Sequence, residues 1–158
     1  MIIMGYPGIG KTTLAKGDYR FIDLDSSSQL LTGIVKKKHW ERQYVGTAIY
    51  LSRKGYHVFV STHPEVIKEV ISRDGNDALI VFPSKDVKEY WLEKLLDRYK
   101  SLPNRQTHNA WRRARDHFDE DIEELGKVKC HQIVLETEKY DLKKDLVHVI
   151  TGLKGGGI

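Results

Sequence analysis

Residues 5–12 read GYPGIGKT, in which two glycines separated by four residues are followed by a lysine and a threonine. The apolar run at 2–4 predicts a buried strand before this stretch, and residues 11–16 begin a helix after it. Glycines let the backbone curl until its N–H groups converge on phosphate oxygens, and the helix directs its positive end at the same anion. A glycine turn before an ordinary helix is the alternative, but strand, loop and helix follow in the order of a phosphate-binding loop, or P-loop. The stretch therefore predicts a site for ATP.

Side chains of this loop have separate predicted roles. Lys11 is expected to reach the β- and γ-phosphates and to act in catalysis, and Thr12 to hold Mg²⁺. ATP and Mg²⁺ are thus the predicted cofactors. The residues predicted to bind ATP are Gly5, Gly8, Ile9, Gly10, Lys11, Thr12 and Thr13.

Apolar runs alternate with helical patterns along the rest of the chain, which predicts an α/β fold: a three-layer sandwich around a five-stranded, mostly parallel sheet. We expect residues 1–153 to form a single domain and residues 154–158 a flexible tail. Further strands are predicted at 19–24, 56–61, 78–82 and 133–135. Helices are predicted at 40–54, from Pro64, from Ser84 to about Lys100, through Trp111 to about Gly126, and through Leu142, Leu146 and Ile150.

Composition bounds the class of protein. The chain has 158 residues, a net charge of +4 and a single cysteine, Cys130, so it forms no internal disulfide and fits a reducing compartment. No apolar run approaches the roughly 20 residues that span a bilayer. We therefore expect a cytoplasmic protein that does not use a membrane. Its modest basic excess suits an anionic partner, and the lysine run at 36–38 is too short for a nucleic-acid tail.

Two aspartates end the second predicted strand. Asp23 and Asp25 share one direction of the strand alternation, which delivers both toward the carboxyl edge where open α/β sheets bind ligands. Asp23 is predicted to act on the metal through water. Asp25 is predicted to orient or deprotonate an acceptor hydroxyl, as a catalytic and substrate-binding residue. The alternative is that Asp25, or a serine after it, caps a helix.

A P-loop followed closely by F-x-D-x-D, here Phe21 to Asp25, resembles the shikimate kinase and gluconate kinase branch of the nucleoside-monophosphate-kinase-like P-loop proteins. That resemblance implies a P-loop kinase fold with a helical lid, Asp23 at the magnesium site and Asp25 at the acceptor. The longer run is also similar to small kinase-like proteins encoded by phages and Firmicutes; it includes DLDSS, VSTHPEV, VFPSK and a late VLE.

The third strand departs from the usual pattern. Residues 58–63 read VFVSTH and offer no carboxylate where many P-loop proteins carry one. Ser61 and Thr62 are candidates to hold a metal-bound water instead. His63 is predicted either to contact the acceptor or only to cap the helix that begins at Pro64. The missing acid argues against a pure ATPase, which needs a firm metal and water site.

Basic side chains gather where related proteins carry a lid, at about 101–115. Phosphoryl transfer needs positive charge around the moving group, and Arg105 and Arg112 are predicted to supply it as catalytic residues. Arg98, at the edge of an apolar stripe, is predicted to bind substrate. The alternative is that these arginines are solvated or pair with Asp116, Asp119 and Glu120.

The acceptor is expected to lie against residues 26–44. Trp40, Arg42 and Tyr44 are candidates to stack a base or hold a phosphate, although core packing explains Trp40 and Tyr44 equally well. The leading functional hypothesis is a phosphotransferase that uses ATP on a nucleoside monophosphate or a nucleoside. A 5′-hydroxyl polynucleotide kinase and an ATP-binding regulator with little turnover are the alternatives, and a nucleic-acid partner is not favoured.

Overall fold

A five-stranded parallel sheet forms the centre of the protein, in a computed structural model that describes residues 1–24 and 39–155. Its strands lie in the order β2-β3-β1-β4-β5, and each neighbouring pair is parallel. They are β1 (Ile2–Gly5), β2 (Phe21–Asp23), β3 (His57–Val60), β4 (Ala78–Pro83) and β5 (His131–Leu135). The predicted α/β class and five-stranded sheet are confirmed, and the sheet is parallel throughout.

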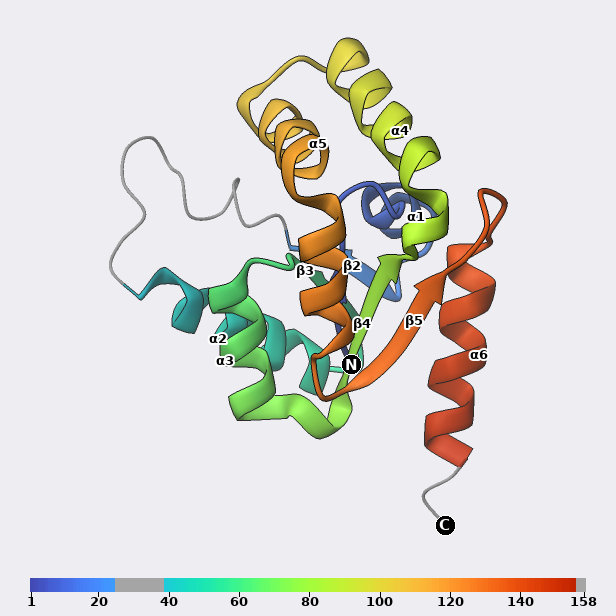
Figure 1. Ribbon diagram of the computed structural model, residues 1–158. Coiled ribbons are helices and arrows are strands. Elements are labelled where there is room, and N and C mark those ends of the chain that lie inside the picture. The colour runs from blue at the N-terminus through green and yellow to red at the C-terminus, as the bar shows by residue number, and fades with distance from the viewer. Residues whose placement is uncertain (25–38, 156–158) are drawn as a thin grey trace.

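Six helices are described, together with two short 3₁₀ segments at Gly75–Asp77 and Lys85–Val87. In Figure 1, α2, α3 and the second half of α5 lie on one side of the sheet and α6 on the other, which makes three layers. The helices are α1 (Lys11–Gly17), α2 (Trp40–Arg53), α3 (Pro64–Asp74), α4 (Lys88–Ser101), α5 (Arg105–Gly126) and α6 (Leu142–Gly155).

β1 is the innermost strand, and its sequence explains why. Ile2, Ile3 and Met4 are all fully buried, because β3 and β4 flank the strand and helices cover both faces. β3 and β4 run parallel to β1 on either side of it, and Met4 of β1 lies beside Val60 of β3 and Ile80 of β4. The loops that follow these strands therefore meet at one edge of the sheet.

Helices α4 and α5 form a hairpin that rises above this carboxyl edge, at the top of Figure 1. Asn104 begins α5 with a capping box: its side chain accepts a hydrogen bond from the Thr107 amide at 2.9 Å, and the Thr107 hydroxyl contacts the Asn104 backbone. α5 is kinked at His117, where φ is −138°. Residues before the kink belong to the hairpin, while Phe118 and Ile122 after it are buried in the core.

The structure differs from several of the sequence-based boundaries. β2 is shorter than the predicted 19–24, because Tyr19 is 86% exposed in the turn before it. The last helix continues through Gly155, so residues 154 and 155 of the predicted tail are helical, and residues 156–158 lie outside the described residues. Ile150 lies on the buried face of this helix, which supports the final turns against the sheet.

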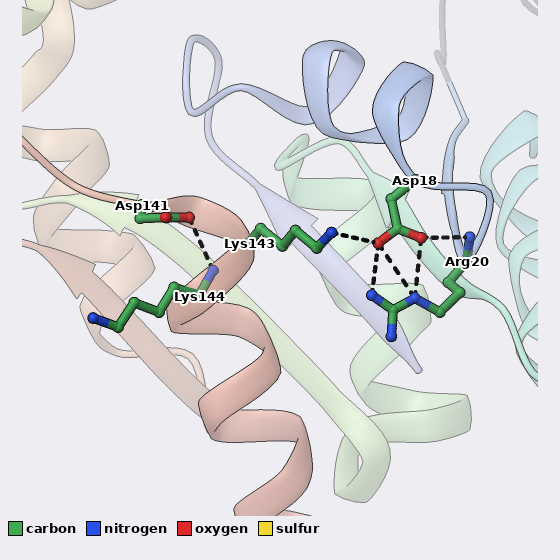
Figure 2. A network of polar contacts seen from close by, with 5 residues as sticks. All are labelled: Asp18, Arg20, Asp141, Lys143 and Lys144. Atoms are coloured by element: carbon green, nitrogen blue, oxygen red, sulfur yellow. Dashed lines mark hydrogen bonds and ion pairs between the residues drawn. The ribbon is translucent and has the colours of Figure 1, made fainter.

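A buried carboxylate ties the end of α1 to the start of α6, as Figure 2 shows. The side chain of Asp18 is 7% exposed and accepts hydrogen bonds from the Arg20 guanidinium, the shortest at 2.6 Å. Lys143 Nζ lies 3.1 Å from the same carboxylate. The hydrogen bonds from Arg20, followed by that from Lys143, hold the pKa of Asp18 well below its usual range.

Candidate functional site

The loop after β1 has a backbone that only glycine accommodates. Gly8 and Gly10 have φ of +88° and +105°, in the left-handed region that favours glycine. A Cβ on Gly8 would also lie 3.0 Å from Leu95 Cδ2, and a Cβ on Gly5 would lie 2.7 Å from Ile9 Cδ1. The loop is thus wound tightly and leads directly into the N-terminus of α1.

Lys11 and Thr12, the first residues of α1, stand at the mouth of this loop. Lys11 Nζ donates a hydrogen bond to the Gly5 carbonyl at 2.6 Å, which folds the ammonium back over the loop. The Thr12 hydroxyl donates to Asp23 Oδ2 at 2.7 Å. The structure therefore brings together the lysine and both residues that the sequence assigned to a metal.

The Thr12–Asp23 pair fits a magnesium ion. A hydroxyl and a carboxylate are hard oxygen donors, and Mg²⁺ is usually bound by one or two protein groups together with phosphates and water. Within residues 1–24 and 39–155, no group of three or more His, Cys, Asp or Glu side chains is arranged to hold a metal by itself. The donors present thus match a metal that a nucleotide brings with it.

The end of β3 presents polar side chains to the same cleft. Ser61, Thr62 and His63 line it together with the P-loop residues. His63 Nδ1 lies 2.8 Å from Ser61 Oγ, and the ring meets Trp40 edge-on at 6.1 Å between centroids. His63 occupies the N-cap position of α3 without a side-chain hydrogen bond to the helix. It therefore caps α3 only by position.

Residues predicted on the acceptor side have different surroundings. Tyr44 is 1% exposed; its hydroxyl donates to the Leu24 carbonyl and accepts from the Ser61 amide. A ring this deeply buried favours the core-packing alternative for Tyr44 over stacking on a base. Trp40 is half-buried against Tyr44, and Arg42 is exposed. Asp25 lies outside the described residues.

The arginines of the hairpin fall into two groups. Arg113 forms a two-pronged ion pair with Asp121, and Arg115 pairs with Asp116 while its guanidinium lies 4.9 Å from the centre of the Trp111 ring. Within the described part of the chain, the remaining three make no ion pair or side-chain hydrogen bond. These are Arg98, Arg105 and Arg112, and all three line the cleft.

Two further residues contact the P-loop and a third contacts one of them, and sequence reasoning missed these contacts. Trp91 Nε1 donates to the Pro7 carbonyl at 2.9 Å, and the Tyr140 hydroxyl donates to the Ile9 carbonyl at 2.9 Å. Lys94 Nζ donates to Tyr140 at 2.8 Å. The one available signal was position, because Tyr140 follows β5 at the carboxyl edge where ligands of parallel sheets bind.

The strand order, the all-parallel sheet and the glycine loop between β1 and α1 define a P-loop kinase-like fold. Among solved structures, the chain is similar to the SH3-kinase fragment of tight junction protein 3 in apo-form, with a TM-score of 0.51 and 14% sequence identity. The match covers 96% of this chain and 56% of that one, and at this identity it concerns the fold alone.

Sequence comparisons add no family to this result. No family model matches the chain, and no curated protein matches it either. The helices of the described residues include none that is long and apolar enough to cross a membrane.

Proposed function

We propose that the protein is an ATP-dependent phosphotransferase whose acceptor is a small anionic molecule, a nucleoside monophosphate first and a nucleoside second. The observation that carries this proposal is a cleft lined both by the P-loop pair Lys11 and Thr12 and by three arginines without ion pairs. Both groups suit phosphate oxygens, and phosphoryl transfer requires positive charge around the moving group.

The number of cations favours a charged acceptor. A nucleoside monophosphate brings a dianionic phosphate beside the triphosphate, and their repulsion must be offset within a few ångströms. Arg98, Arg105 and Arg112 are available for this because, among the described residues, none of the three forms an ion pair with a carboxylate. A neutral acceptor would not require three such side chains.

The proposed chemistry assigns one task to each group. An acceptor oxygen attacks the γ-phosphorus, the bond to the β–γ bridging oxygen breaks, and ADP leaves. Lys11 binds the β- and γ-phosphates, Arg105 and Arg112 neutralise charge that spreads onto the moving group, and Arg98 holds the acceptor phosphate. Mg²⁺, held through Thr12 and through water by Asp23, supplies charge neutralisation on the phosphate oxygens.

Fewer residues of the described chain are proposed to bind the acceptor. His63 lines the cleft, and we propose that it contacts the acceptor. Trp40 and Arg42, at the start of α2, are proposed to bind its base or phosphate. Asp25 is proposed to orient the attacking hydroxyl or phosphate, as the resemblance to F-x-D-x-D kinases implies.

A coupled assay of ADP release tests the proposal. The acceptors are ribo- and deoxyribonucleoside monophosphates, nucleosides, shikimate, gluconate and 5′-hydroxyl oligonucleotides. We expect stimulation by at least one nucleoside monophosphate. Stimulation by shikimate or gluconate alone would remove the nucleotide acceptor, and stimulation by oligonucleotides alone, weakening with salt, would indicate a polynucleotide kinase.

One observation favours a second candidate, an ATP-binding regulator with little turnover. The segment after β3 brings Ser61 and Thr62 to the cleft, where a carboxylate would fix the metal and its water more firmly. ATP binding without stimulation by any acceptor would support this candidate over the phosphotransferase.

A further inference from the structure

Side chains from two distant segments hold the outer side of the P-loop. The indole N–H of Trp91, on α4, donates to the Pro7 carbonyl at 2.9 Å. The Tyr140 hydroxyl, between β5 and α6, donates to the Ile9 carbonyl at 2.9 Å and lies 3.4 Å from the Gly8 carbonyl. Three successive carbonyls of the loop therefore face side chains that belong to other elements.

The two rings support each other. Trp91 and Tyr140 are stacked, with centroids 5.9 Å apart and planes inclined by 21°. Trp91 is fully buried, so its N–H requires a partner, and Pro7 is the partner it has. The stacked pair thus forms one rigid layer against the loop.

Lys94 fixes the direction of the Tyr140 hydrogen bond. Its ammonium donates to the Tyr140 oxygen at 2.8 Å and lies 4.6 Å from the centre of the Trp91 ring. An ammonium can only donate hydrogen bonds, so the Tyr140 oxygen must accept the bond from Lys94. The hydroxyl proton of Tyr140 is then directed to the Ile9 carbonyl. Burial raises the pKa of Tyr140 to about 12 and lowers the pKa of Lys94 below its usual value.

Peptide geometry links these outer contacts to the phosphate side of the loop. In a trans peptide the carbonyl of one residue and the N–H of the next point in opposite directions. Anchoring the Pro7 and Ile9 carbonyls outward therefore turns the amides of Gly8 and Gly10 the other way. Amides of this loop are the groups expected to bind phosphate oxygens.

We propose that Trp91, Lys94 and Tyr140 are positioning residues for the phosphate site: they hold the Gly8 and Gly10 amides toward the ligand and so make phosphate binding depend on α4, the first helix of the hairpin. This inference rests on the proposed function only in requiring that the loop bind a nucleotide. The three residues form a brace outside the loop, and phosphate transfer itself involves none of them.

The first experiment measures binding of ADP and of inorganic tripolyphosphate, which has no base, by titration calorimetry. Tyr140→Phe removes the hydroxyl and keeps the stacked ring, and we expect both ligands to bind about tenfold more weakly, the loss of roughly one hydrogen bond. Tyr90→Phe is the matched control. The Tyr90 ring also adjoins Trp91, but within the described residues its hydroxyl makes no hydrogen bond, so we expect affinity within about twofold of the parent.

Three other results of these binding measurements would contradict the inference or the proposed function. Unchanged ADP and tripolyphosphate affinity in Tyr140→Phe would overturn the inference. Weaker ADP with unchanged tripolyphosphate would also overturn it, because Tyr140 would then contact the nucleoside. If the parent protein binds neither ligand, the proposed function fails before the inference is tested.

The second experiment separates positioning from general stability by NMR of the ¹⁵N-labelled protein without ligand. We expect Tyr140→Phe to shift the Gly10 amide and the Trp91 indole resonance, while Tyr90→Phe leaves Gly10 in place. Lys94→Met should weaken tripolyphosphate like Tyr140→Phe, and Lys94→Arg, which keeps a cationic donor, should recover most of the loss. Equal affinity of the Met and Arg variants, or an unmoved Gly10 resonance in Tyr140→Phe, would contradict the role assigned to the brace.

Discussion

Lys11 is held in place before any ligand arrives, because its ammonium already bonds to the Gly5 carbonyl of its own loop. A phosphate that enters the loop can take over this donor with little movement of the side chain. The ordering cost of a long, flexible side chain is then met partly during folding. Lys11 is thus expected to be the principal charged contact of the triphosphate.

The first prediction concerns this side chain. Lys11→Ala should fold normally and lower acceptor-stimulated ADP release by about a hundredfold or more, because a preorganised cation at the transferring phosphates is removed. Lys16→Ala, on the exposed side of the same helix, is the control and should be near the parent rate. Parental activity in Lys11→Ala would exclude the P-loop as the site of transfer.

A second prediction concerns Asp23, which accepts a hydrogen bond from the Thr12 hydroxyl. Asp23→Asn should raise the magnesium concentration needed for half-maximal activity by roughly tenfold, the usual effect of losing an indirect metal partner. Titration of MgCl₂ against activity measures this, and Asp97→Asn, an exposed carboxylate on α4, should behave like the parent. An unchanged magnesium requirement would assign Asp23 a purely structural bond to Thr12.

The sequence predicted the residues of the site only where they belong to a recognisable motif. The spacing of the loop glycines pointed to Lys11 and Thr12, and strand alternation pointed to Asp23. Trp91 was predicted only as an apolar face of a helix, because nothing local reveals that its indole meets a carbonyl 84 residues earlier in the chain. The role of Tyr44 stayed open for a related reason: a helical stripe does not tell a core ring from a binding ring until the neighbouring strands are placed.

At the scale of elements, α5 connects the helical hairpin to the core around the sheet. Its first half carries the hairpin arginines, its second half packs in the core, and the kink at His117 lies between them. The Arg113–Asp121 ion pair spans this kink, with a shortest distance of 2.7 Å. The pair therefore holds the two halves in one relative orientation and leaves Arg105 and Arg112 for the cleft.

The third prediction compares arginines on this one helix. Arg105→Ala and Arg112→Ala should each lower kcat roughly tenfold or more, because each removes a cation from the transition state. Arg115→Ala should leave kcat within about twofold, since Arg115 is already ion-paired with Asp116. The measurement is kcat with the best acceptor, and an equal loss in all three variants would indicate damage to the hairpin instead.

The order of helices and strands could be predicted from the sequence, but the kink in α5 and the full length of β5 could not. Alternating apolar and helical patterns predicted every strand, because strand burial leaves a strong compositional signal. The kink in α5 left none, because the helix contains no proline and no glycine near His117; Phe118, directly after the kink, meets the Tyr6 ring edge-on with centroids 6.1 Å apart. β5 was predicted too short because His131 and Gln132, its first two residues, are polar and exposed at the sheet edge.

For the whole molecule, the Asp18 network connects parts of the chain that are far apart in sequence. It joins α1, which carries the phosphate loop, to α6 through Lys143. The pKa of Asp18 is depressed in the folded state, so its stabilisation is present above the unfolded pKa, about 3.9, and is lost as the pH falls below that value.

The fourth prediction follows from the lowered pKa of Asp18 in the folded state. At pH 7 Asp18→Asn should unfold at a lower temperature than the parent, and the difference should narrow steadily as the pH falls below about 4. Thermal unfolding followed by circular dichroism over a pH series measures it, with Asp97→Asn as the exposed control. A difference that stays constant down to acid pH would show that the charge of Asp18 contributes nothing.

The brace on the loop has a consequence for how the protein is made. Ile9 is synthesised 131 residues before Tyr140, the side chain that anchors its carbonyl. While a ribosome is still translating, β1 lacks first β3, then β4, and finally this anchor, so the nascent loop has its glycines but not its final shape. Nucleotide binding should therefore emerge late in translation, after β5 and the residues beyond it have left the exit tunnel, and a nascent chain stalled before them should bind no ADP.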